Sequence, residues 1–170
     1  WYLSTHDAMT DLYNRAYFSE EISRIERGRI FPISIFMADL DGLKEVNDDL
    51  GHSAGDELLK RTAQLLRSSF QSEDVVARIG GDEFAVLLPG ADENAAQAAM
   101  TRVRRNLQAM NEKMGDPSLS LSFGVATGQK GVPLEEILRK ADENMYAEKL
   151  AKLGRKARGT GPLSGQSYFP

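Results

Sequence analysis

The segment RIGGDEFAVLLP, residues 78–89, places carboxylates in a turn between apolar residues. Asp82 and Glu83 directly follow Gly80 and Gly81. In an isolated turn this composition has a structural explanation, because glycine permits unusual backbone angles and aspartate favours turns. A chemical role for the acids therefore needs a second group of side chains that the fold brings to the same place.

Such a group follows the apolar segment 30–38 (IFPISIFMA), which reads as a buried strand with Asp39 and Asp41 directly after it. Ligands commonly bind where the strands of a sheet end. If this strand lies beside residues 78–89, Asp39 and Asp82 approach each other and their charges repel, which a divalent cation would relieve. Because hard oxygen ligands select Mg2+ or Mn2+, we expect one of these metals.

The residues around these acids suit a nucleoside triphosphate. Gly80 and Gly81 leave room for a phosphate or base to approach the backbone, and Lys44 and Lys149 supply positive charge for phosphates. Metal ions held by carboxylates stabilise the attacking and leaving oxygens when a hydroxyl attacks an α-phosphate. This pattern predicts nucleotidyl transfer, although a calcium site or a solvated acidic loop would use the same residue types.

Apolar residues alternate between helical and strand-like spacing along the chain, which indicates strands interleaved with helices. The spacing predicts helices at 16–27, 54–70, 92–110 and 134–152, and strands at 30–38, 75–79, 84–88 and 119–127. Strands 75–79 and 84–88 form a hairpin around the glycine turn. We expect a loop from Asp39 to a helix N-cap at Ser53, and a tail at 154–170 whose Gly, Ser and Pro content is typical of disorder.

The composition limits the protein to one domain and few classes of partner. With 170 residues, 41% of them hydrophobic, the chain is long enough for one substantial core and too short for two. A net charge of -4 argues against duplex nucleic acid as a partner. The lack of cysteine excludes disulfides and thiolate metal sites. No apolar run reaches the roughly 20 residues that cross a membrane, and because the chain begins at Trp1 we expect it to be part of a longer protein.

Several motifs in the chain resemble those of one family, in the family's order. Residues 80–84, GGDEF, preceded by Arg78, match the signature of the GGDEF domains, which are diguanylate cyclases. DAMTDLYNR at 7–15 resembles the family's opening motif, DLDGLKEVND followed by GHSAGDELL resembles its substrate segment, and ADENMYAEK at 141–149 resembles its closing helix. A lone GGDEF string is a weak signal, but these motifs in register over residues 4–155 are a specific one.

The resemblance implies a fold, a reaction and an assembly. Family members are similar to the palm domains of adenylyl cyclases and polymerases, with an α+β fold in which helices flank a mixed, mainly antiparallel central sheet. Two domains face each other, each with one GTP, and together form cyclic di-GMP and pyrophosphate. We therefore expect GTP as substrate, a homodimer of catalytic domains, a core at 4–155 with a tail at 156–170, and an upstream sensory or dimerising region in cis. The domain would be cytoplasmic, or the cytoplasmic part of a membrane-anchored protein, with no membrane or nucleic-acid contact of its own.

The same resemblance assigns the acids to metal binding and catalysis. Asp39 and Asp82 would be metal ligands, with the Leu40 carbonyl as a third. Glu83 would be a neighbouring essential acid. Either Glu83 or Asp82 would help to deprotonate the attacking 3′-hydroxyl, and the sequence leaves that choice open.

The resemblance assigns phosphate binding to a second set of residues. Lys44 and Lys149 would neutralise phosphate charge, and the backbone near Leu43 and Gly81 would approach the nucleotide. The family's closing Gly-Arg also contacts phosphate, but Arg155 follows Lys149 at a greater spacing than in the family, which puts its role in doubt.

Guanine would be read by Asn47 and Asp56. An amide exchanges hydrogen bonds with the guanine edge, and a carboxylate accepts from its N1–H and N2–H2 groups, which adenine does not present in that arrangement. Asn47 as a loop or capping residue and Asp56 as a first-turn helix acid are the structural alternatives. Those alternatives do not account for both residues at family positions.

The chain departs from the family at the inhibitory product-binding motif, Arg-x-x-Asp, upstream of the signature. Here the corresponding residues are Gln71 and Asp74, so the arginine is lost and the acid is kept. Glutamine cannot make the bidentate, charge-assisted contact that arginine makes with a phosphate or guanine. We therefore expect weak product inhibition.

Three hypotheses of different classes remain. An active diguanylate cyclase is favoured. A catalytically silent module that binds GTP or cyclic di-GMP is the alternative, against which stand the intact acids and base-reading residues Asp39, Asp82, Glu83, Asn47 and Asp56. A purely structural oligomerisation domain would not need residues that read guanine.

Overall fold

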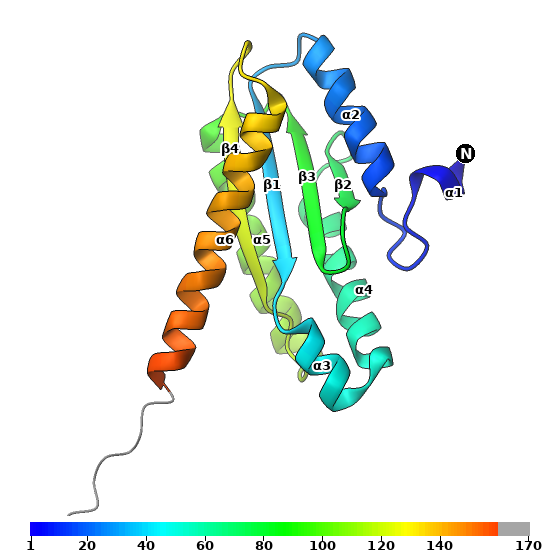
Figure 1. The fold of residues 1–170 in the computed structure, drawn as a ribbon, viewed down its shortest axis with the longest axis vertical. Coiled ribbons are helices and arrows are strands. Elements are labelled where there is room, and N and C mark those ends of the chain that lie inside the picture. Colours follow the sequence, from blue (N-terminus) through cyan, green and yellow to red (C-terminus); the bar gives the residue numbers. More distant parts are fainter. Residues whose placement is uncertain (160–170) are drawn as a thin grey trace, which may run out of the picture.

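The computed structural model describes residues 1–159, and its centre is one four-stranded antiparallel sheet in the order β2-β3-β1-β4 (Figure 1). The strands are β1 (Ile33–Leu40), β2 (Val75–Arg78), β3 (Glu83–Pro89) and β4 (Leu121–Gly128). The helices are α1 (Tyr2–Thr5), α2 (Arg15–Arg27), α3 (Leu43–Leu50), α4 (His52–Ser69), α5 (Glu93–Met114) and α6 (Leu134–Gly159). An isolated parallel bridge joins Tyr13 to Ala77. The α+β class and the hairpin of β2 and β3 are confirmed.

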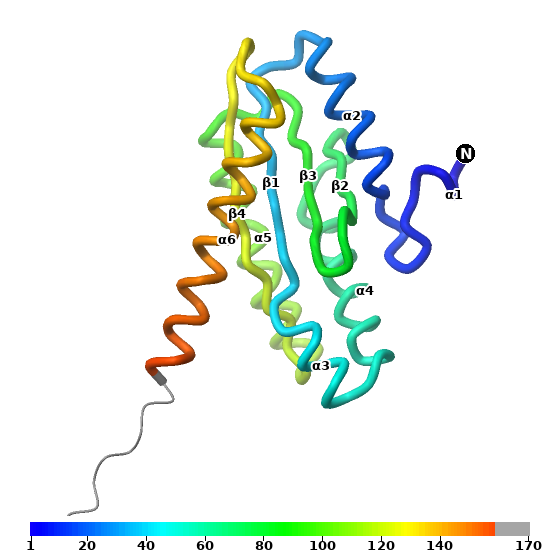
Figure 2. The backbone as a smooth tube through the Cα atoms, viewed as in Figure 1, coloured from blue at the N-terminus to red at the C-terminus, as the bar shows by residue number. Residues whose placement is uncertain are grey.

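The strand β1 runs inside the sheet, between β3 and β4, with helices on both faces of the sheet (Figure 2). Its alternate residues belong to different core clusters. Ile35 and Met37 lie in a core cluster with residues of α2 and α6, whereas Phe36 and Ala38 lie in a cluster with residues of α4 and α5. Side chains alternate between the two faces of a strand. Asp39 therefore continues the first series and points towards α6.

The helix α6 packs directly on β4 because a glycine lets the two backbones meet. A Cβ atom on Gly124 would lie 2.1 Å from the carbonyl oxygen of Ala141 and 2.2 Å from the amide nitrogen of Met145. No other residue type fits at that distance. This contact holds the C-terminal half of α6 beside the end of β1, where it delivers Lys149.

The first strand lies further along the chain than the sequence spacing predicted. It was expected at 30–38 and spans Ile33–Leu40. Pro32 has no N–H for a sheet ladder and directly precedes the strand, while Ile30 is 48% exposed. The shift matters for the site, because Asp39 lies inside β1 rather than in the loop after it.

The loop expected from Asp39 to Ser53 contains α3, and Ser53 is not an N-cap. The next helix, α4, begins at His52 with Gly51 as its N-cap residue. Leu43 and Leu50 of α3 are seven residues apart with Val46 between them, a helical spacing that could have revealed α3. The signal is weak because α3 has eight residues and none of them is buried.

The C-terminal helix is longer than the sequence predicted. We expected α6 to end at Lys152 and a tail to begin at Gly154, but α6 continues through Gly154 to Gly159. The rest of that expected tail, 160–170, lies outside the described residues. None of the helices in residues 1–159 combines the length and apolar character needed to span a membrane.

Candidate active site

The end of β1 meets the turn between β2 and β3, as the sequence led us to expect. Asp39 lies opposite Glu83 in the antiparallel pairing of β1 with β3. The next amide, of Leu40, donates to the carbonyl of Asp82 at 2.9 Å. Asp39 and Asp82 are near enough that the charge of Asp82 acts on the pKa of Asp39. The expected approach of the two acids is therefore confirmed.

Asp39 is a buried acid, and one of its two carboxylate oxygens has no hydrogen-bond partner in residues 1–159. Burial raises its pKa to about 6, the neighbouring Asp82 raises it as well, and a hydrogen bond from Lys149 opposes the rise. Lys149 Nζ donates to Oδ2 of Asp39 at 2.6 Å. The other oxygen, Oδ1, is buried without a hydrogen-bond partner among residues 1–159. A buried, unpartnered carboxylate oxygen is a group that a bound cation would satisfy.

The donor set at this point fits a hard divalent cation. Within the described part of the chain, no group of three or more His, Cys, Asp or Glu side chains is arranged to hold a metal. The available donors are the carboxylates of Asp39 and Asp82 with the carbonyl of Leu40. Mg2+ usually binds one or two carboxylates and fills its remaining positions with water and substrate phosphates. The residues present therefore fit such an ion completed by a nucleotide.

The neighbouring acid, Asp41, has a structural role instead. Its carboxylate accepts hydrogen bonds from Ser122 at 2.8 Å, Ser120 at 2.9 Å and Lys152 at 3.1 Å. These bonds join the residue after β1 to β4 and α6. Because both oxygens of Asp41 accept hydrogen bonds whereas Oδ1 of Asp39 does not, the structure distinguishes two acids that the sequence presents as a pair.

The glycines of the turn provide space rather than unusual backbone angles. We expected Gly80 and Gly81 to adopt such angles, but neither has a positive φ. A Cβ on Gly80 would lie 3.0 Å from Oε2 of Glu83, so the missing side chain makes room for that acid. A Cβ on Gly81 would meet nothing within 4 Å in residues 1–159, which leaves its backbone open to a ligand.

Arg78 stabilises the turn between β2 and β3 through hydrogen bonds to its carbonyl groups. Its guanidinium donates to the carbonyl of Gly81 at 2.7 Å and to that of Gly80 at 3.2 Å. It also forms an ion pair with Asp7 at 3.2 Å. Burial raises the pKa of Asp7, but hydrogen bonds from Thr10 and Arg78 outweigh it, so the net pKa is lowered. Asp7 belongs to the motif DAMTDLYNR, whose sequence did not indicate that this acid fixes Arg78 against the turn.

A pocket of about 560 Å³ opens at the end of β1, and we call it the phosphate pocket. It is bordered by Leu40, Leu43 and Asp82, and it contains the lysines Lys44, Lys149, Lys152 and Lys156. The N-terminus of α3 also borders it. Gly42, the N-cap residue, has a φ of 73°, and no side chain in the described residues caps the helix there. The first amides of α3 are therefore free of a cap and add donors that favour anions.

A second pocket of about 300 Å³, which we call the base pocket, shares Leu43, Lys44 and Asp82 with the first. It also includes Asn47 and Gly81. The side-chain oxygen of Asn47 is buried and has no hydrogen-bond partner in residues 1–159; it lies against Gly55 of α4, where a Cβ would come within 1.8 Å of it.

The two pockets do not include every residue that was expected to bind substrate. Asp56 is partly exposed on α4, and Arg155 is exposed on α6. Within the described residues, neither of them lines the phosphate pocket or the base pocket. Glu83 borders the site from β3, opposite Asp39.

Comparison with known proteins assigns the chain to a family. Residues 4–155 match the family model described as diguanylate cyclase, GGDEF domain. The chain belongs to the GGDEF domain family. It is 35% identical over 150 residues to the diguanylate cyclase DosC of Escherichia coli strain K12. The aligned region covers 84% of this chain and 32% of DosC. The chain thus spans about a third of that relative.

Solved structures of GGDEF domains have the same fold. The diguanylate cyclase SiaD of Pseudomonas aeruginosa, in complex with its activator SiaC, superimposes with a TM-score of 0.79 at 28% identity, covering 88% of this chain and 60% of that one. The GGDEF domain of PA1120 from the same organism gives a TM-score of 0.76 at 36% identity, covering 86% and 89%. The expected palm-like fold is confirmed.

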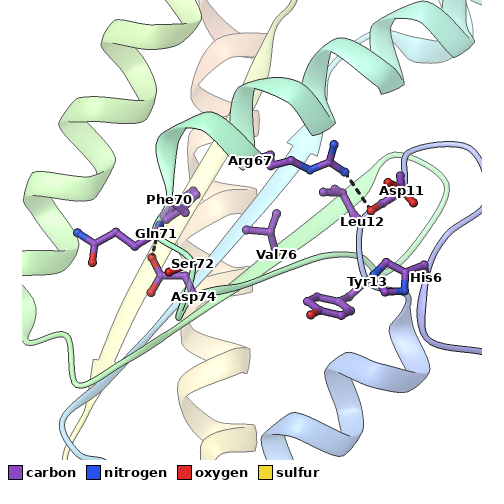
Figure 3. A pocket seen from close by; sticks show the side chains of 10 residues that line it. All are labelled: His6, Asp11, Leu12, Tyr13, Arg67, Phe70, Gln71, Ser72, Asp74 and Val76. Carbon is purple, nitrogen blue, oxygen red and sulfur yellow. Dashed lines mark hydrogen bonds between the residues drawn. The ribbon is translucent and has the colours of Figure 1, made fainter. Parts of the chain in front are cut away.

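The segment 71–74, which corresponds to the family's inhibitory motif, lies between α4 and β2, beside a pocket of about 410 Å³ (Figure 3). Asp74 accepts a hydrogen bond from the backbone amide of Gln71 at 2.9 Å, and burial raises its pKa. The side chain of Gln71 is exposed and points away from the pocket. Arg67, at the other side, donates to the carbonyls of Thr10 and Asp11. The contact between Gln71 and Asp74 is thus made by the backbone amide of Gln71. The side chain of Gln71 donates no hydrogen bond to Asp74.

A cation that the sequence analysis missed reaches this segment from α5. Arg102 lines a pocket of about 340 Å³ together with Gln71 and Asp74, and its charge lowers the pKa of Asp74 against the larger effect of burial. Its Nε donates to the carbonyl of Ser69 at 2.5 Å. No local pattern marks this arginine, because only the packing of α5 on α4 brings it to the segment.

Proposed function

We propose that this domain is a diguanylate cyclase, which condenses two GTP into cyclic di-GMP and two pyrophosphates. The observation that carries the proposal is the unpartnered, buried Oδ1 of Asp39, next to Asp82 at the edge of a pocket with four lysines. DosC and SiaD, both named diguanylate cyclases, support it. Asp39, Asp82 and the Leu40 carbonyl would hold Mg2+ or Mn2+, which supplies charge stabilisation for the attacking and leaving oxygens.

The residues of the two pockets divide the work on one nucleotide. Lys44 and the first amides of α3 bind phosphate oxygens, and Lys149 places a further positive charge beside them. Asn47 of the base pocket reads guanine together with Asp56, which lies on α4 outside both pockets. As each 3′-oxygen forms its bond to an α-phosphorus, the bond to the pyrophosphate oxygen breaks, and the hydroxyl proton passes to Asp82 or Glu83.

The reaction requires two copies of the domain. Each copy binds one GTP, and the 3′-hydroxyl held by one copy attacks the α-phosphate held by the other, so the active species is a homodimer of catalytic domains. The chain covers 32% of DosC, and we propose that a sensory or dimerising region in cis, in a cytoplasmic protein or part of one, brings the copies together. Product inhibition is weak because Gln71 replaces the inhibitory arginine.

Incubation of the 170-residue chain with GTP and Mg2+, followed by chromatography of the products, tests this function. Because two loaded copies must meet, the rate per chain should rise with protein concentration. Cyclic di-GMP and pyrophosphate in a 1:2 ratio are expected. The silent binding module would be supported if GTP binds but no product forms at any protein concentration, and none forms when the chain is fused to a dimeric coiled coil.

A further inference from the structure

The strand β4 lies at one edge of the sheet, so half of its backbone groups face away from β1 (Figure 1). Backbone groups at a sheet edge need partners other than a neighbouring strand. Three side chains of α6 bind three of these groups. The pairs are Asn144 with the carbonyl of Val125 at 3.0 Å, Glu148 with the amide of Phe123, and Lys152 with the carbonyl of Leu121.

The spacing of these pairs matches the helix to the strand. The helix residues are four apart, which is about 6.0 Å along the helix axis, and the strand residues are two apart, which is about 6.6 Å along the strand. The residue numbers rise along α6 as they fall along β4, so each step on the helix meets the next outward-facing group of the strand. We call these three contacts the edge ladder.

The edge ladder fixes a degree of freedom that the close contact at Gly124 leaves open. Gly124 allows α6 to approach β4, but a glycine has no side chain that interlocks with the helix. A slip of α6 by one residue would move its side chains by about 1.5 Å along the axis and about 100° around it. Such a slip would separate the three side chains from their backbone partners, so the edge ladder opposes it.

Glu148 is the central residue of the edge ladder and is held from two sides. One carboxylate oxygen accepts from the amide of Phe123, and the other pairs with Nη1 of Arg104 at 2.7 Å. Arg104 comes from α5 and lies over the ring of Phe123, 5.2 Å from its centroid. The next residue on α6 is Lys149, whose Nζ donates to Asp39 at 2.6 Å. The contacts of Glu148 therefore fix the backbone from which Lys149 extends.

We propose that Glu148 is a positioning residue, which sets the register of α6 on the edge of β4 and thereby holds Lys149 beside Asp39. Among the described residues, Glu148 is not one of those that line the phosphate pocket or the base pocket, so it acts through Lys149 and not on the nucleotide. Its effect on the position of Lys149 is independent of any substrate. Its effect on synthesis rests on the proposed function.

The reactivity of Lys149 in the 170-residue chain, without nucleotide or metal, tests this proposal. Lys149 is partly exposed to an amine-reactive reagent, but its Nζ is held in the ion pair with Asp39. Modification at each lysine is followed by mass spectrometry. Glu148→Ala should speed modification of Lys149 about five- to tenfold, because α6 loses its central contact with β4. Glu148→Gln should largely restore the slow rate, since its amide oxygen can still accept from Phe123.

Other residues of α6 provide a second variant and the controls. Asn144→Ala breaks the neighbouring contact of the edge ladder and should also speed modification of Lys149, which keeps the test decisive if Glu148→Ala does not fold. Glu143→Ala is the matched control, because Glu143 is exposed and forms its ion pair with Arg139 of the same helix. Lys140, exposed on α6, is the internal reference for the reagent.

The outcomes separate this inference from the proposed function. In folded variants, an unchanged rate at Lys149, or an equal rise at Lys149 and Lys140, would overturn the positioning role. Synthesis of cyclic di-GMP should fall in Glu148→Ala and recover in Glu148→Gln, in the same order as the protection of Lys149. A loss of synthesis with Lys149 still protected would also overturn the role. If the unmodified chain makes no product and Lys149 responds as expected, the proposed function fails and this inference stands.

Discussion

Lys149 and Asp39 form an ion pair across the site, with Nζ of the lysine 2.6 Å from Oδ2 of the acid. The pair joins α6 to the end of β1, and both members were expected from the sequence to act on the substrate or its metal. The lysine partly compensates the burial of Asp39, yet the pKa of the acid remains raised to about 6. Asp39 is thus an acid whose ionised form its protein surroundings stabilise poorly.

The stability of the metal-free domain should depend on pH through Asp39. Its folded pKa of about 6 lies above the value near 4 of an unfolded chain, so the folded state holds the proton more tightly. The contribution to stability is full below pH 4 and is lost as the pH rises through about 6. Urea unfolding of the wild type and Asp39→Asn without metal measures it. The wild type should lose stability relative to the variant across this window; parallel curves would contradict the prediction.

Replacement of Asp82 should abolish synthesis and leave the fold intact. Asp82→Asn removes a carboxylate from the metal site, while the turn backbone, including the bond from Leu40 to the Asp82 carbonyl, is unchanged. Turnover at high protein concentration and thermal unfolding are the measurements. Asp41→Asn is the contrast, because Asp41 joins β1 to β4 and its replacement should chiefly lower the melting temperature. Near-normal turnover in Asp82→Asn would remove Asp82 from the mechanism.

Cyclic di-GMP should inhibit the enzyme weakly. The exposed Gln71 supplies no charge at the inhibitory segment, and Arg102 is engaged with the Ser69 carbonyl. Initial rates at saturating GTP with added product give the inhibition constant. Gln71→Arg should tighten inhibition about tenfold or more, since a bidentate charged contact is restored. Submicromolar inhibition of the unmodified enzyme, lost in Arg102→Ala, would show that Arg102 suffices alone.

Base choice should depend on Asp56. An adenine would present its unprotonated N1 to the carboxylate, and the opposed acceptors cost about 1 to 3 kcal/mol, or roughly tenfold or more in discrimination. With equal GTP and ATP the product should be almost entirely cyclic di-GMP, and Asp56→Ser should yield mixed products. Substantial cyclic GMP-AMP from the unmodified domain would exclude Asp56 as a base reader.

The docking of α6 should be sensitive to a single methyl group at Gly124. Gly124→Ala places a Cβ within 2.1 Å of the Ala141 carbonyl, which forces α6 away from β4 and should cost about 1 to 3 kcal/mol of unfolding free energy. Synthesis should fall as well, because Lys149 moves with the helix. Gly154→Ala is the control: its Cβ would meet nothing within 4 Å in residues 1–159, and it should stabilise α6 by about 0.5 to 1 kcal/mol. Equal stability of both variants would be inconsistent with close packing at Gly124.

The sequence by itself determined the elements whose residues are buried. The continuous apolar run of β1 and the long apolar stripe of α4 are strong patterns, because each buried position constrains residue type. The acids at the end of β1 and in the hairpin turn are visible for the same reason, since charged residues interrupt apolar segments there. These local signals indicated strands interleaved with helices and which acids could meet if the strands paired, whereas the α+β class followed from the resemblance to the GGDEF family.

Only the tertiary structure decided which of these residues are available to bind metal or substrate, because the availability of a side chain depends on partners that are distant in the chain. Asp39 and Asp41 look alike in sequence, but Ser120, Ser122 and Lys152 occupy Asp41 alone. Arg102 reaches the inhibitory segment through helix packing that has no local signature. Lys156 rather than Arg155 lines the pocket because α6 stays helical through Gly154, whose weak helix propensity is overridden in this chain.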